Sequence, residues 1–258
     1  MKKYVNLFVF VFMVGACFSQ GKAQTKSAVS YKNPVVDIAM PDPTVIKAAD
    51  GYFYMYATES TRNVPIMKSK DLVQWTYCNT AFTNKTRPRF EPKAGIWAHD
   101  INYINNKYVL YYAMSVWGGE QTCGIGVATA DSPQGPFTDH GKMFRSNEIG
   151  VQNSIDPSFL QYEGRNYLVW GSFRGIYVIE LTEDGLSLKP GAEKKRIAGT
   201  AFEAAYIHKH GDYYYMFASI GSCCEGIRST YKVVVGRSKK VWGPYKDKSG
   251  KPMLKNGY

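Results

Sequence analysis

Short runs of aromatic and β-branched residues recur along this chain, and an acidic residue and a turn precede each run. The four stretches are residues 42–56, 100–112, 156–170 and 203–217. Aromatic and β-branched residues favour strands, and no amphipathic pattern of helical period and substantial length appears. A repeated unit that contains only strands is typical of a β-propeller, in which similar sheets surround one axis. The pattern therefore predicts an all-β fold of propeller type.

Two kinds of turn divide each stretch into strands. The inner turns have a small or amide residue in their second position, at Gly51, Asn106, Gly164 and Gly211. The outer turns fall at residues 69–75, 130–137, 181–186 and 238–245. Strand-forming runs such as residues 125–129 and 233–237 lie between them, so each unit offers about four strands, the size of a propeller blade. Four nearly complete units reach almost to Tyr258, and we expect four blades.

The N-terminus has a basic start and a short apolar stretch that are typical of a secretory signal, which we place at residues 1–23. The stretch is too short to cross a bilayer. Two processing routes remain open: cleavage before Cys17, which would leave a lipid anchor on that residue, or cleavage near Ala23. A polar linker at residues 24–30 leads into a domain at residues 31–258. We therefore expect an exported protein that is secreted, periplasmic or an outer-membrane lipoprotein.

The composition fits one large globular domain, with 45% hydrophobic and 15% aromatic residues. The formal net charge is +11, but the basic residues are scattered and most fall at predicted turns. Such a distribution is typical of a solvated surface. Nucleic-acid binding needs a basic stripe on one face, and the export signal also argues against that partner. We expect a monomer.

The acidic residues that open the units are candidate catalytic groups. A propeller brings the same point of every blade to one central face, so Asp42, Asp156 and Glu203 would be neighbours. Proline follows both aspartates, and we expect it to impose an extended backbone there and to place each acid at the start of its blade's first strand. Carboxyls that converge on one cleft can perform acid/base chemistry.

Five ordered segments resemble glycoside hydrolase family 43, and most closely its endo-1,5-α-L-arabinanases. They are residues 42–46, 97–101, 153–157, 170–176 and 223–231. The resemblance extends from about Asn33 to the end of the chain. It implies a five-bladed propeller, whose C-terminal blade we expect to be lacking here. It also implies hydrolysis, with inversion, of the α-1,5-linked L-arabinofuranosyl bonds of plant cell-wall arabinan or arabino-oligosaccharides.

The resemblance further implies roles for individual residues. Asp42 matches the general base that activates water, and Glu203 the general acid that protonates the leaving group. Asp156 matches an acid that orients the substrate, and we expect its negative charge to keep Glu203 protonated near neutral pH. Trp97 and Trp117 match positions where the family places aromatic groups at the sugar. Further substrate contacts are expected from Asp100, Asn153, Ser172 and Cys223.

The chain departs from the family pattern at two points. His99 stands where the family usually has proline, and we expect it on a loop, with a contact to the substrate as the alternative. The family's fifth blade carries a histidine that helps to hold a metal ion, often calcium, and nothing after Lys251 supplies it. We therefore predict no metal ligands and no required cofactor, with a calcium ion of the family type as the alternative. The adjacent Cys223 and Cys224 lack the spacing of a zinc site and are expected to be buried or cleft-lining thiols.

Three functions remain open from the sequence. The first is the inverting arabinan hydrolase, and the second is a non-catalytic carbohydrate-binding propeller. The third is a related glycosidase, either an exo-acting arabinofuranosidase or xylosidase of the same family or a retaining enzyme. A retaining enzyme has its two working carboxyls about 5 to 5.5 Å apart, whereas an inverting enzyme has them about 6.5 to 9.5 Å apart.

Overall fold

A computed structural model describes residues 30–254 of this chain. The described residues from Asn33 onwards form one compact unit, and the fold below is that of this unit. The expected signal at residues 1–23, its Cys17 and nearly all of the expected linker lie outside the described residues. Within residues 30–254, no helix is long and apolar enough to span a membrane.

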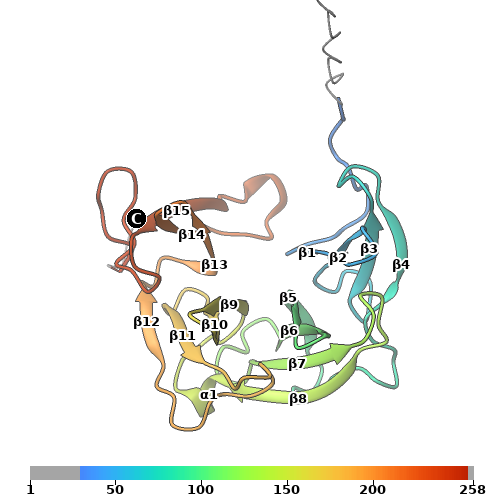
Figure 1. Ribbon diagram of the computed structural model, residues 1–258, viewed down its shortest axis with the longest axis horizontal. Coiled ribbons are helices and arrows are strands. Elements are labelled where there is room, and N and C mark those ends of the chain that lie inside the picture. Colours follow the sequence, from blue (N-terminus) through green and yellow to red (C-terminus); the bar gives the residue numbers. More distant parts are fainter. Residues whose placement is uncertain (1–29, 255–258) are drawn as a thin grey trace, which may run out of the picture. The chain divides into compact units, whose positions relative to one another are not determined.

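Four antiparallel sheets, here called blades 1 to 4, surround a common centre (Figure 1). Blade 1 contains β1 (Thr44–Lys47), β2 (Phe53–Tyr56), β3 (Pro65–Ser69) and β4 (Thr76–Thr80). Blade 2 contains β5 (Gly95–Ile104), β6 (Lys107–Ser115), β7 (Gly124–Ala130) and β8 (Thr138–Arg145). Blade 3 contains β9 (Ser158–Tyr162), β10 (Arg165–Trp170), β11 (Ile176–Glu180) and β12 (Lys195–Ala198). Blade 4 contains β13 (Glu203–His210), β14 (Tyr213–Ile220) and β15 (Lys232–Ser238).

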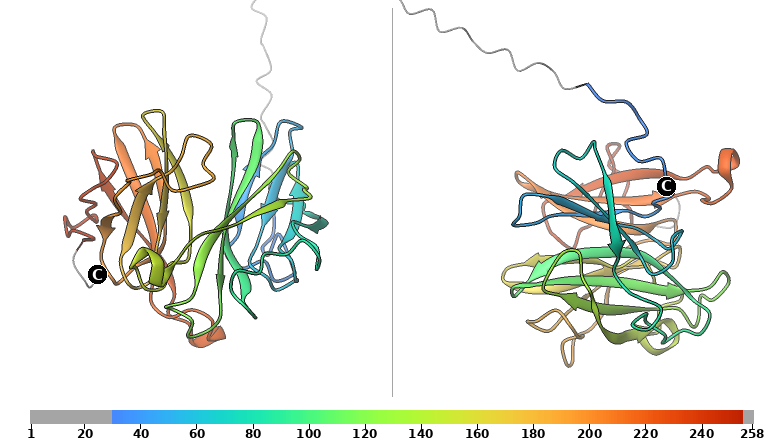
Figure 2. Two further views of the ribbon diagram at one scale, coloured as in Figure 1. Left: turned by 90° about the horizontal axis from the view of Figure 1, so that it is seen from below. Right: turned by 90° about the vertical axis from the view of Figure 1, so that its right-hand side faces the viewer.

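The strands of each blade follow one another in chain order from the centre outwards, so β1, β5, β9 and β13 lie innermost (Figure 1). Figure 2 shows the same sheets from two further sides, with their connecting loops gathered at both ends. The two helices of the described region, α1 (Ser146–Ile149) and η1 (Gly226–Arg228), have four and three residues. The prediction of an all-β propeller with four blades is confirmed.

The turns fall where the sequence predicts them, but blade 4 differs from the expectation of about four strands. The inner hairpin turns lie between β1 and β2, β5 and β6, β9 and β10, and β13 and β14. Gly51 and Asn106 have φ values of +84° and +62° there, a backbone region that glycine and asparagine tolerate. In the fourth blade the described residues form three strands, and Lys246 pairs with Arg237 only through an isolated bridge.

The hydrophobic core lies between the blades. Neighbouring residues of one strand point to opposite faces, so Leu110 and Tyr112 pack toward blade 1, whereas Tyr111 packs with Leu168 and Trp170 of blade 3. A third cluster joins blades 3 and 4. The buried hydroxyl of Tyr111 donates to the carbonyl oxygen of Gly185 over 2.8 Å, which satisfies its polar group. This two-sided burial explains the continuous apolar runs that the sequence shows.

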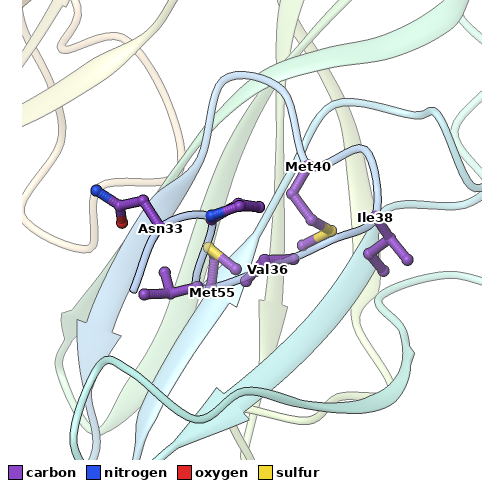
Figure 3. A pocket seen from close by; sticks show the side chains of 7 residues that line it. Asn33, Val36, Ile38, Met40 and Met55 are labelled. Carbon is purple, nitrogen blue, oxygen red and sulfur yellow. The ribbon is translucent and has the colours of Figure 1, made fainter. Parts of the chain in front are cut away.

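Blades 1 and 4 each keep one partly open face. Tyr206, Phe217 and Val235 form one row across β13, β14 and β15, and their exposed fractions are 53%, 39% and 42%. On blade 1, Val45 is 44% exposed. Its strand partner Met55 lines an apolar pocket of about 590 Å³ (Figure 3). The other residues that line this pocket are Asn33, Pro34, Val35, Val36, Ile38 and Met40.

Candidate active site

The three predicted acids come from three blades and lie at their innermost strands. Asp42 and Asp156 stand two residues before β1 and β9, and Glu203 is the first residue of β13. The carboxylates of Glu203 and Asp42 both act electrostatically on Asp156. The structure therefore brings together three groups that are far apart in the sequence, as the repeat pattern predicts.

The prediction of an extended backbone at the two aspartates is wrong. Asp42 has a φ of +49° and Asp156 a φ of +59°, which places both in the left-handed region. A following proline disfavours the right-handed helical region, and aspartate is among the few residues that tolerate the left-handed one. Strained conformations of this kind persist only where the surroundings hold them, and they are concentrated at functional sites.

Glu203 is buried, and hydroxyl groups hold its carboxylate. Its exposed fraction is 8%, and the Ser172 hydroxyl donates to Oε2 over 2.6 Å. The Asn153 side-chain amide donates to the same Ser172 hydroxyl over 2.9 Å. Tyr231 also hydrogen-bonds to Glu203. Asn153 and Ser172, which we expected to contact the substrate, thus line the site as supports of Glu203.

We expected Asp156 to be negatively charged beside a protonated Glu203, but the surroundings of Asp156 disfavour its ionised form. Desolvation, followed by the charges of Glu203 and Asp42, raises the pKa of Asp156 well above its usual range, although the backbone N–H of Ala204 donates to it. The structure therefore favours a proton on Asp156 in the free site.

The two tryptophans that the family resemblance marks lie against each other. The ring centroids of Trp97 and Trp117 lie 5.7 Å apart at an angle of 50°. Trp97 packs beside Ile155, the residue before Asp156, and Trp117 is 78% exposed. An exposed aromatic ring of this kind can offer an apolar surface to a sugar, and the contact of both tryptophans with the substrate stays a prediction.

Cys223 also lies at the site. Both cysteines of the vicinal pair are free thiols, with Cys223 half-buried and Cys224 exposed. Burial, contact with Cys224 and the charges of Glu203 and Asp42 raise the pKa of the Cys223 thiol to about 12. The thiol is therefore neutral at physiological pH, so Cys223 is a neutral group beside the carboxyls.

Asp100 joins three blades through its hydrogen bonds. Its carboxylate is buried and accepts hydrogen bonds from the Phe159 backbone N–H over 2.6 Å and from the Asn102 amide over 2.8 Å. The Thr44 hydroxyl donates over 3.5 Å. These contacts join blades 1, 2 and 3 at the centre, and burial raises the pKa of Asp100 to about 6. Its expected role in substrate binding stays a prediction, whereas its role in joining the blades is visible.

His99 does not lie on a loop as we expected. It belongs to β5 and is 6% exposed, because the register of β5 and β6 shifts between Trp97 and Asp100 and turns the imidazole inwards. Neither ring nitrogen has a hydrogen-bond partner among residues 30–254. Burial lowers the pKa of His99 to about 3, although the charge of Glu59 opposes this effect.

The buried His99 is expected to weaken the fold in acid. His99 binds a proton near the ordinary pKa of 6.5 in the unfolded chain, but only near pH 3 in the folded chain. The unfolded state is therefore favoured by protonation, and the free energy of unfolding falls as the pH falls from 6.5 towards 3. The variant His99→Leu should flatten the dependence of the free energy of unfolding on pH by up to about 1.4 kcal/mol per pH unit. Denaturant titrations from pH 7 to pH 4 measure it, with the exposed His208→Gln as control. An unchanged slope in His99→Leu would contradict this account.

The described donors do not make a metal site by themselves. Within the part of the chain that the structure describes, no group of three or more His, Cys, Asp or Glu side chains could hold a metal ion. No step below runs through a metal. The requirement for a cofactor stays a matter for experiment.

Comparison with known proteins identifies the family of this chain. The family model described as glycosyl hydrolases family 43 matches residues 31–257. The chain belongs to this family. An extracellular endo-α-(1→5)-L-arabinanase of Bacillus subtilis is 38% identical to this family 43 chain. The matched region covers 84% of this chain and 70% of that relative. An extracellular exo-α-(1→5)-L-arabinofuranosidase of Cellvibrio japonicus is 34% identical over 84% of this chain and 69% of that relative.

Solved structures show the same relationship for the fold. The α-L-arabinanase of Cellvibrio cellulosa in complex with arabinohexaose superposes with a TM-score of 0.77 and 32% identity, over 85% of this chain and 77% of that chain. A native arabinanase of Bacillus subtilis superposes with a TM-score of 0.74 and 33% identity, over 86% of this chain and 79% of that chain. This family 43 chain is therefore a glycosidase of propeller fold.

Two polar residues at the site, Thr58 and Tyr231, have no role assigned from the sequence. Thr58 contacts Asp42 through its hydroxyl, and no motif or spacing points to it. Tyr231 lies at the end of a segment that carries the family resemblance, so the sequence contained a signal for it, although no role was assigned.

Proposed function

We propose that this family 43 chain hydrolyses the α-1,5 bonds between L-arabinofuranosyl units of arabinan and arabino-oligosaccharides with inversion of configuration. The observation that carries the proposal is the meeting of Asp42, Asp156 and Glu203 from three blades. Similarity to proteins that are named as arabinanases supports the choice of sugar.

The proposed reaction is one displacement with two proton transfers. Asp42 takes a proton from a water molecule as the water oxygen bonds to the anomeric carbon. The bond from that carbon to the leaving oxygen breaks, and Glu203 gives its proton to this oxygen. Because water attacks the face opposite to the leaving group, the configuration of the anomeric carbon inverts.

The surrounding residues prepare these transfers. Ser172 and Tyr231 fix the carboxylate of Glu203, so that it does not need to reorganise during the reaction. Asp156 lies between the influence of Asp42 and that of Glu203, and its role is to orient the sugar. Trp97 and Trp117 offer an aromatic surface to the sugar rings beside the reacting bond.

The test is the product of arabinohexaose. Proton NMR of the first product released by the full chain should show the β-anomer before mutarotation, and the variant Asp42→Asn should release none. First appearance of the α-anomer would indicate a retaining reaction and overturn the proposal. Binding of the oligosaccharide without any release would favour the carbohydrate-binding alternative.

An exo-acting enzyme is a second candidate, because the relative from Cellvibrio japonicus is named as an exo-acting arabinofuranosidase. Early release of several internal fragments from arabinan indicates endo action, whereas one product of fixed size indicates exo action. We further infer export, since these relatives are named extracellular. Lipid attachment at Cys17 is tested by mass spectrometry of the mature N-terminus, and the expected monomer by its mass in solution.

A further inference from the structure

Thr58 follows β2 and makes three hydrogen bonds around the proposed base. Its backbone N–H donates to the carbonyl oxygen of Pro41 over 2.9 Å. Its hydroxyl donates to Oδ2 of Asp42 over 2.6 Å and accepts from the backbone N–H of Ala98 over 2.7 Å. One side chain of blade 1 therefore holds Asp42 and reaches the innermost strand of blade 2.

The Ala98 contact fixes the direction of the Thr58 hydroxyl proton. A hydroxyl has one proton to donate and accepts through its lone pairs. Because Ala98 contributes an N–H, it occupies a lone pair, and the single proton is directed to Oδ2 of Asp42. Within residues 30–254, the structure shows no hydrogen bond to Oδ1 of Asp42. One carboxylate oxygen is thus held, and the other is left to receive a proton.

The same hydroxyl joins two strained positions. Asp42 and Ala98 are not glycines, yet their φ values are +49° and +39°. Left-handed conformations of such residues persist where the surrounding structure over-determines them. The Thr58 hydroxyl contacts the side chain of one and the backbone of the other, so it supports both at the junction of blades 1 and 2.

We propose that Thr58 is the positioning residue of the base: it presents Oδ1 of Asp42 to the attacking water and stabilises the ionised carboxylate. The inference rests on the proposed function, in which Asp42 activates that water. Thr58 acts through Asp42 and is not expected to contact the reacting atoms itself.

The test compares Thr58→Val, which keeps the shape of the side chain, with Thr58→Ser, which keeps the hydroxyl. With arabinohexaose as substrate, Thr58→Val should lower kcat by about 10- to 100-fold, the value of one hydrogen bond to a charged group, with a smaller change in KM. The acidic limb of its kcat/KM profile should move to higher pH, because a lost donor disfavours the ionised carboxylate. Thr58→Ser should restore both properties.

The matched control is Ser60→Ala. Ser60 lies on the same loop, and its hydroxyl donates to the Ala39 carbonyl oxygen over 2.5 Å without a contact to Asp42. It should keep the normal kcat and pH profile, and thermal unfolding should show that every variant is folded. Thr58→Ala provides the same comparison if Thr58→Val does not fold.

The outcomes separate this inference from the proposed function. A normal kcat and pH profile in Thr58→Val, beside an inactive Asp42→Asn, would overturn the role of Thr58 alone. Loss of activity in Ser60→Ala equal to that in Thr58→Val would also overturn it, because the loop and not the hydroxyl would then matter. Normal turnover in Asp42→Asn would overturn the proposed function and this inference with it.

Discussion

The variant Glu203→Gln should lose about 10²- to 10⁴-fold in kcat on arabinan, the usual contribution of a general acid or base. Glutamine keeps the size of the side chain and its contact with the Ser172 hydroxyl, but it has no proton to give to the departing sugar oxygen. The measurement is the initial rate of release of reducing ends from arabinan at the optimal pH of the unmodified chain.

A substrate whose leaving group needs no proton distinguishes the loss of a general acid from other losses of activity. An aryl α-L-arabinofuranoside with an acidic phenol leaves without protonation, so Glu203→Gln should retain far more activity on it than on arabinan. Asp42→Asn serves as the matched control and should lose activity on both substrates, because both reactions need an activated water. Equal losses of Glu203→Gln on the two substrates would contradict the assignment of Glu203 as general acid.

Removal of Glu59 should cost about 3 to 5 kcal/mol of the free energy of unfolding, the usual effect of breaking a buried ion pair. Glu59 pairs with Arg87, and the exposed fractions of the two side chains are 9% and 8%. Burial acts to raise the pKa of Glu59, but hydrogen bonds from Arg87, Ile96 and Asn63 outweigh it and hold the pKa below its ordinary value. Glu59→Ala would leave the guanidinium of Arg87 buried without its partner.

Urea titration of Glu59→Ala at pH 7 measures this loss as a lower midpoint. The control is Lys107→Ala, which removes the surface pair of Lys107 with Asp131, whose exposed fractions are 51% and 84%. Exposed pairs contribute only about 0 to 1 kcal/mol, so the midpoint of the control should hardly move. Equal midpoints for both variants would show that the Glu59 pair is not a major contribution to stability.

The sequence predicted the parts of this fold that depend on local patterns. The inner turns at Gly51 and Asn106 are marked by their own residue types, and short runs of aromatic and β-branched residues mark the strands beside them. The meeting of the acids followed from the repeat, because equivalent points of the blades must lie near one centre. These features could be inferred without knowledge of any contact.

The features that could not be predicted depend on contacts between distant residues. The inward position of His99 comes from a register shift between β5 and β6, and a bulge of this kind leaves no mark on residue types. The partners of Thr58 are Asp42 and Ala98, which are 16 and 40 residues away in the chain. The proline rule failed at Asp42 because it describes local sterics, whereas the surrounding hydrogen bonds decide the backbone there.

The order of the blades has a consequence for how accurately the two reacting groups are spaced. The inner strands contact one another in the series β1 with β5, β5 with β9, and β9 with β13. Asp42 precedes the first strand of this series and Glu203 begins the last. A small rotation of one blade against its neighbour changes the position of every later blade in the series, and rotations in the same direction add up. The packing of the cores between the blades therefore sets the gap between Asp42 and Glu203 in which one water molecule must fit.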